Sequence, residues 1–227
     1  MSEIQAYAID FGTSNSAAAW YDGTRVRLVD LEHDDTIMPT ATHLDRELHT
    51  KTGIAAVQQY IEENRDRIVE LTSEVVGKSQ LLIGERDIED PESEAEVTSV
   101  AVYSQPQVDR GLPGRLFRGV KRLLGNASIK RLLVFDHPFR LVALITPVLL
   151  HVRYCIEKAV SEPIEDVHVG HPVKFEGHDA LRNQLALSRL GEACHHAGFA
   201  HVSFYPEPVA ATLSYLYEEE ASTTIPS

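Results

Sequence analysis

The stretch from Ile4 to Trp20 constrains the fold most, because it joins two apolar runs through a short polar turn. The first run ends at Asp10, the turn covers residues 12–15 (Gly-Thr-Ser-Asn), and a run of small apolar residues follows. An apolar run, a tight turn and a second apolar run are typical of a β-hairpin. We therefore expect two antiparallel strands at the start of the chain.

The residues of this turn also favour anion binding. Gly12 permits a positive φ and lets the main chain approach a ligand closely. Successive main-chain N–H groups in such a turn attract anions, and the hydroxyls of Thr13 and Ser14 add donors. Asp10, at the strand end, is well placed to hold a hydrated Mg²⁺, which binds few carboxylates and keeps its waters. The pattern predicts a phosphate-binding hairpin; the alternative is an ordinary hairpin with turn-forming residues.

The periodicity of the remaining chain predicts strands first and helices later. Asp22-Gly23 is expected to connect the hairpin to a third strand, which completes an antiparallel meander. In order, we expect strands at 25–31 and 36–43, a helix at 53–76, an acidic loop at 86–96, a strand at 97–103 and an irregular segment at 106–114. After these come helices at 138–159, 179–197 and 209–219, with strands at 167–173 and 201–205 between them. His151 and Cys155 lie beside the apolar stripe of the first of these helices and are interpreted as packing residues.

A basic cluster stands out in an otherwise acidic chain. Its members are Arg115, Arg118, Lys121 and Arg122, interleaved with apolar residues. One interpretation is a solvated face that balances neighbouring acids. The other places one of these cations over a phosphate, since neutralising the charge on a transferring phosphoryl group is the main task of such a site.

Composition limits the partners and the location. A formal net charge of −13 among 227 residues, with no basic face evident, argues against nucleic acid as a partner. Two cysteines give no disulfide framework or metal spacing, which favours a reducing cytoplasm. We expect no signal peptide and no membrane span, because the longest apolar run, 141–150, is too short and contains Pro147.

The order of elements predicts an α/β protein with a mixed sheet flanked by helices. An antiparallel meander opens the chain, and strands alternate with helices in its last third. We expect residues 1–35 and 136–227 to form the core and residues 36–135 to form an inserted α+β subdomain.

With these elements placed, the chain resembles the first lobe of the nucleotide-binding domain of Hsp70-type chaperones. Four segments carry the resemblance in the right order: 10–16 (Asp-Phe-Gly-Thr-Ser-Asn-Ser), 120–125 (Val-Lys-Arg-Leu-Leu-Gly), 167–172 (Val-His-Val-Gly-His-Pro) and 197–211, which ends in Glu-Pro-Val-Ala-Ala. Segments 171–177 and 205–211 are most similar to the divergent Hsp70-like proteins of the YegD type. The resemblance implies a ribonuclease H-like, actin-like ATPase lobe with a five-stranded mixed sheet.

The resemblance also implies roles for particular residues with ATP or ADP and Mg²⁺ as cofactors. Asp10 and Glu207 would hold the metal through water from opposite sides. The turn Gly12, Thr13, Ser14 and Asn15 would cradle the β- and γ-phosphates, although Asn15 departs from the family's usual tyrosine. Lys121 would stabilise the transferring phosphate and help to position the attacking water. Pro172 would be the switch proline, and Arg182 is its candidate partner, with a spacing two residues different from the family's.

The 227 residues contain no Asp-x-Gly-Gly-Gly-Thr motif, the second phosphate loop that the family places in its second lobe. We therefore expect a first lobe alone, from a parent that hydrolyses ATP, with weak or no nucleotide binding by this chain because half of the phosphate contacts are missing. Client proteins or co-chaperones are the other expected partners. Two alternatives stay open: a fragment of a sugar or small-molecule kinase of the same fold, for which no general base stands out, and a non-catalytic module that binds another chain through an exposed apolar face.

Overall fold

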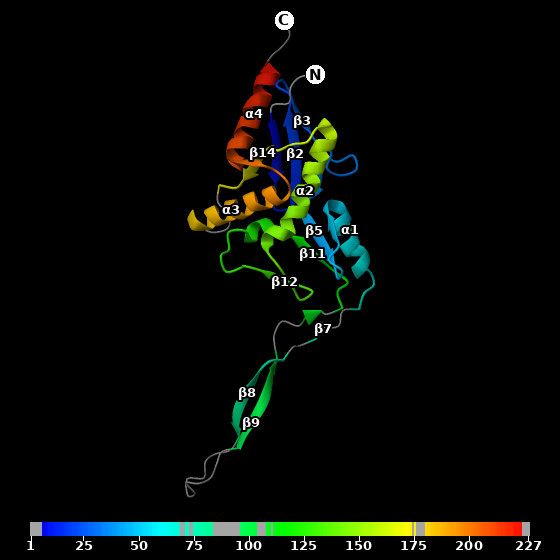
Figure 1. Cartoon of the computed structure of the whole chain (residues 1–227), viewed down its shortest axis with the longest axis vertical. Helices are drawn as coiled ribbons and strands as arrows, with labels where there is room; N and C mark the ends of the chain where they lie inside the picture. Colours follow the sequence, from blue (N-terminus) through cyan, green and yellow to red (C-terminus); the bar gives the residue numbers. More distant parts are fainter. Residues whose placement is uncertain are drawn as a thin grey trace. The chain divides into compact units, whose positions relative to one another are not determined.

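A computed structural model describes residues 6–68, 71–72, 75–83, 96–103, 108–109, 111–173, 175 and 180–223 (Figure 1). The contacts between residues divide the chain into two compact units, residues 1–63 with 114–227 and residues 64–113. The second unit is narrower than the insertion expected from the sequence, 36–135, and each unit is described by itself.

The larger unit is built on a mixed sheet. Its strands are β1 (Ala6–Phe11), β2 (Asn15–Tyr21), β3 (Val26–Leu28), β4 (Ile37–Pro39), β14 (Asp166–His171) and β15 (His201–Pro206). The order is β15-β14-β1-β2-β3, in which β15, β14 and β1 are parallel and the rest antiparallel. The expected meander is confirmed, and so is an α/β arrangement with a mixed sheet. The sheet has one strand more than the five expected. This strand, β4, pairs with residues 15–17 of β2, whereas β3 pairs with residues 19–21 of the same strand.

Smaller sheets complete the larger unit. A three-stranded sheet has the order β11-β5-β6, and β12 pairs with β13 in a hairpin. The bounds are β5 (Ala41–Asp45), β6 (Thr50–Thr52), β11 (Gly114–Arg118), β12 (Leu132–Val134) and β13 (His137–Phe139), and a 3₁₀ helix, η1 (Val120–Leu123), follows β11. The single strand expected at 36–43 is therefore two strands in different sheets. The Thr40 amide still donates to the carbonyl of Ser14, at 2.9 Å, which extends the β4–β2 pairing by one residue, and the chain enters the second sheet at Ala41.

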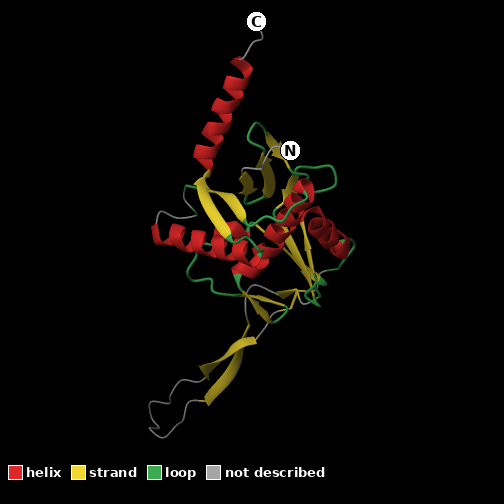
Figure 2. Cartoon of the chain, turned by 45° about the horizontal axis from the view of Figure 1, so that its top comes forward, coloured by secondary structure: helices red, strands yellow, loops and turns green. Residues whose placement is uncertain are grey.

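Helices cover the sheet and supply much of the core. They are α1 (Gly53–Asn64), α2 (Leu141–Val160), α3 (Ala180–His196) and α4 (Glu207–Thr223). Figure 2 shows α2 and α3 as neighbours, and α2 also contacts β2, β5, β6 and η1. The stripe predicted for α2 is confirmed, because its apolar residues at 141, 144, 145, 148, 152 and 156 are all buried. The stripe predicted for α3 is wrong at its start, where Leu181 is exposed.

The described residues of the smaller unit form two antiparallel strand pairs. β7 (Leu71–Thr72) pairs with β10 (Val108–Asp109), and β8 (Val75–Ile83) pairs with β9 (Glu96–Tyr103). The strand expected at 97–103 is confirmed, but the helix expected to continue to residue 76 ends at Asn64. Asp66 adopts a left-handed φ of 58°, and the following valines and isoleucine are β-branched, which favours strands over helix. Most of the acidic loop expected at 86–96 lies outside the described residues.

None of the helices in the described part of the chain combines the length and the apolar character needed to cross a membrane.

Candidate functional site

The candidate site lies at the carboxyl ends of the three parallel strands. Residues 8 and 9 of β1 pair with residues 168 and 169 of β14, and residues 170 and 171 of β14 pair with residues 205 and 206 of β15. This register brings Asp10, Gly170 and Glu207, the first residue of α4, to one edge of the sheet. Ligands of open α/β sheets characteristically bind at this edge.

Lys121 reaches the same edge from η1. Its Nζ lies 2.8 Å from Oε1 of Glu207, and the two side chains are 4% and 40% exposed. Gly119, with a left-handed φ of 69°, turns the chain from β11 into η1. The buried ammonium group is therefore paired with a carboxylate that still reaches solvent, 86 residues away in the sequence.

Asp10 is electrostatically coupled to this ion pair. Loss of hydration raises the pKa of the Asp10 carboxyl first, the charge of Glu207 raises it further, and Lys121 acts in the opposite direction. Two carboxylates thus share one cation, and their mutual repulsion favours an additional positive charge. Carboxylate oxygens of this kind suit a hydrated Mg²⁺, which Asp10 and Glu207 would hold through its waters.

The turn after β1 lies beside the start of η1. A Cβ atom placed on Gly119 would be 3.9 Å from Cγ2 of Thr13. Gly12 is required for close packing, because a Cβ there would lie 2.2 Å from the carbonyl oxygen of Asn15. The expected positive φ at Gly12 is not observed, since the glycines with positive φ in the described residues are at positions 23, 53, 119 and 198.

Two hydroxyl groups and one main-chain bond brace this turn. The side chains of Ser16 and Thr40 are buried and hydrogen-bonded at 2.7 Å. Together with the bond from the Thr40 amide to Ser14, they fix β4 to the start of β2. Ser14 and Asn15 stay exposed, so their side chains remain accessible to a ligand. No sequence pattern pointed to Thr40, because it contacts residues far away along the chain.

The remaining predicted residues are distributed as follows. Pro172 directly follows β14 and is half-buried, and its carbonyl accepts a hydrogen bond from Nδ1 of His171 at 2.8 Å. The main chain of Arg182 packs against Gly125, two residues after η1, since its carbonyl oxygen lies 3.0 Å from the position of a Cβ on Gly125. Contact between Arg182 and Pro172 stays a prediction. Of the basic cluster, Lys121 joins the carboxylates, whereas Arg115 lies over the ring of Phe135 at 5.5 Å.

No family model matches the chain. The resemblance of the sequence to the Hsp70-type chaperones therefore stays a prediction.

Proposed function

We propose that the chain is one lobe of an actin-like ATPase domain, related to the Hsp70-type chaperones, whose site binds the phosphates of Mg-ATP. The observation that carries the proposal is the gathering of Asp10, Lys121 and Glu207, which are remote in sequence, at the carboxyl edge of a parallel sheet segment. The site adds a glycine turn beside η1. This combination of a cation, two carboxylates and exposed turn donors matches the chemistry of a metal–phosphate group.

Each side chain then has a distinct task. The turn of residues 12–15 would donate N–H and hydroxyl groups to phosphate oxygens. Lys121, held by Glu207, would supply positive charge without the cost of ordering a flexible side chain at the moment of binding. Asp10 and Glu207 would accept hydrogen bonds from metal-bound waters, and bound Mg²⁺ would neutralise phosphate charge.

The affinity of the 227-residue chain for nucleotide is expected to be weak. The assembled contacts address phosphate and metal, and the sequence holds no Asp-x-Gly-Gly-Gly-Thr loop to supply a second set. Few contacts are then left to offset the lost freedom of the ligand. Micromolar binding of Mg-ATP in a calorimetric titration would refute this half-site description.

An NMR titration with Mg-ATP detects such weak binding and locates it. We expect amide shifts at residues 12–15 and 119–121, weaker in Ser14→Ala and Thr13→Val, and abolished in Lys121→Met. Lys130→Met is the matched control, because Lys130 is exposed in the loop before β12. Circular dichroism checks that each variant is folded. The proposal fails if the shifts cluster elsewhere or if Lys121→Met and Lys130→Met behave alike.

A second candidate function, binding of another protein chain, is favoured by α4. Val209, Leu213 and Leu216 project from this helix with half or more of each side chain exposed. Exposed apolar groups gathered on one element are typical of interaction surfaces. If a second copy covers this surface, light scattering will show dimers that Leu213→Glu abolishes. If light scattering shows a monomer at all concentrations, self-association is not the function of α4.

A further inference from the structure

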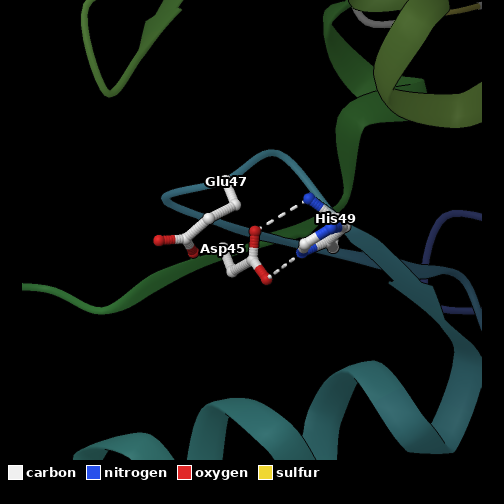
Figure 3. A group of neighbouring side chains, drawn as sticks. All are labelled: Asp45, Glu47 and His49. Atoms are coloured by element: carbon white, nitrogen blue, oxygen red, sulfur yellow. Dashed lines mark hydrogen bonds and ion pairs between the residues drawn. The ribbon is translucent and has the colours of Figure 1, made fainter.

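Three metal-ligating side chains meet in the connection between β5 and β6, on residues to which the proposed nucleotide site assigns no role (Figure 3). Asp45 is the last residue of β5, and Glu47 and His49 lie in the turn before β6. The paired strands hold the ends of this turn together, through a ladder that runs from residues 42 and 52 to residues 44 and 50. A main-chain bond from the Asp45 amide to the His49 carbonyl, 3.2 Å long, closes it.

His49 holds the Asp45 carboxylate in place, and the two residues would bind the same metal ion. Its Oδ1 accepts the main-chain N–H of His49 at 2.7 Å, and its Oδ2 lies 3.0 Å from Nδ1 of the His49 ring. In Figure 3 the Asp45 carboxylate lies between the Glu47 side chain and the His49 ring. The hairpin therefore holds these two side chains together before any ion arrives, and an ion bound to Nδ1 would replace the proton of this hydrogen bond, which is released to solvent.

The spacing of the donors suits one ion. One ligand atom from each of the three residues lies within 4.8 Å of the others. Two donors bound to a tetrahedral zinc ion at about 2.0–2.2 Å lie roughly 3.3 Å from each other. The Asp45–His49 pair is already close to that separation. Glu47 is exposed, so rotation of its side chain can close the remaining distance.

The donor types indicate the class of ion. Magnesium and calcium take oxygen ligands, and magnesium releases its waters reluctantly. An imidazole nitrogen beside carboxylates instead suits the borderline divalent transition metals such as zinc and nickel. We propose that Asp45, Glu47 and His49 bind a divalent transition-metal ion of the zinc type, with solvent filling the remaining coordination positions and the ion clipping the β5–β6 hairpin.

A second histidine on the surface offers an internal comparison. Nδ1 of His33 lies 2.9 Å from Oδ2 of Asp34, and both side chains are almost fully exposed. Within the described residues, however, the group at 45, 47 and 49 is the one where three such donors come together. A chain with a net charge of −13 attracts cations generally. A specific metal site is therefore identified only if replacement of His49 weakens metal binding and replacement of His33 does not.

The test is a calorimetric titration of the full, untagged chain with zinc chloride in excess magnesium chloride, without nucleotide. We expect saturable binding that His49→Gln and Glu47→Gln weaken at least about tenfold, as loss of groups at metal sites commonly does. His33→Gln is the matched control and should bind as the unaltered chain does. Zinc should also raise the melting temperature of the unaltered chain and of His33→Gln, but not of His49→Gln.

The His49 side chain is 80% exposed, so its replacement should leave the metal-free melting temperature almost unchanged. The proposal is overturned if the unaltered chain does not bind zinc, if His49→Gln binds it as well as His33→Gln does, or if magnesium removes the binding. None of these results bears on nucleotide binding, so the two proposals can fail separately.

Discussion

The buried ammonium group of Lys121 depends on Glu207, the acidic partner with which it forms an ion pair at 2.8 Å. We expect Glu207→Gln to lower the free energy of unfolding by about 1–2 kcal/mol, because it leaves a buried cation with a neutral partner. The cost stays below that of a fully buried pair since the Glu207 side chain is 40% exposed. The double variant Lys121→Met/Glu207→Gln should recover part of the loss in urea denaturation. If Glu207→Gln unfolds at the same urea concentration as the unaltered chain, the ion pair is not a source of stability.

We expect His151 to make the stability of the fold depend on pH. The contact with Cys155, at 3.5 Å, and a hydrogen bond to the Leu31 carbonyl raise the pKa of His151 to about 9 against the opposing effect of burial, and Glu32 adds to the rise. A folded pKa above the unfolded value stabilises the fold below about pH 6.5, and this contribution is lost as the pH rises through 9.

Between pH 6.5 and 9, the unaltered chain should therefore lose stability relative to His151→Gln. Because His151 is only half-buried, solvent screening limits the difference to on the order of 1 kcal/mol. Urea denaturation at several pH values measures it, and an NMR titration of the His151 ring gives its pKa directly. A titration midpoint near 6.5 would show that the contacts of His151 do not hold the proton.

At the scale of single elements, one glycine inside α3 and another just after its end have opposite expected effects. Gly198 follows the end of the helix with a φ of +97°, and a Cβ there would overlap Nη1 of the Arg153 guanidinium. Gly191 lies inside the helix, where a Cβ would make an ordinary contact of 3.6 Å with the Phe204 ring. We expect Gly198→Ala to destabilise by about 1–2 kcal/mol and Gly191→Ala to stabilise by about 0.5–1 kcal/mol. Thermal and urea unfolding of the two variants test this geometry. Changes in stability of the same sign in both variants would contradict it.

Elements with a strong local pattern could be predicted from the sequence. The β1–β2 hairpin and α2 show this, since two apolar runs around a polar turn in one and a 3.6-residue stripe in the other are complete within each segment. The end of α1 could not be found this way, because apolar residues at 68, 71 and 75 continue its spacing although their neighbours favour strands. The strand β11 was missed for a similar reason, as its basic residues suggested a solvated face.

The residues of the candidate site also differ in whether local sequence predicts their role. Asp10 and the turn at residues 12–15 could be recognised locally, because a strand end and turn residues are adjacent in sequence. Nothing near Lys121 in the sequence indicates that its partner is Glu207, 86 residues later. Only the family resemblance predicted that the two residues belong to one site. The pattern Asp45-x-Glu47-x-His49 was visible in the sequence, but spacing alone does not show that a turn folds the three side chains toward one another.

For the whole molecule, the division into two units predicts that the larger one folds without the smaller. The chain leaves and re-enters the larger unit at nearly the same place. Nε2 of His43 lies 2.8 Å from Oε2 of Glu63, and a Cβ on Gly114 would lie 2.4 Å from that same oxygen. A short linker can therefore span the gap, and closing a shorter loop costs less entropy than closing the natural one.

We expect replacement of residues 65–112 by a Gly/Ser linker of about six residues to leave a cooperatively unfolding protein. Its melting temperature should stay within a few degrees of the full chain's, because the core of the larger unit consists of residues outside the excised segment. The same linker in place of residues 129–140 is the control. That excision removes the β12–β13 hairpin and with it Val134, which is fully buried in the core, so cooperativity should be lost. Circular dichroism melts compare the two. If the 65–112 excision also melts broadly, the smaller unit is part of one cooperative fold and the division fails.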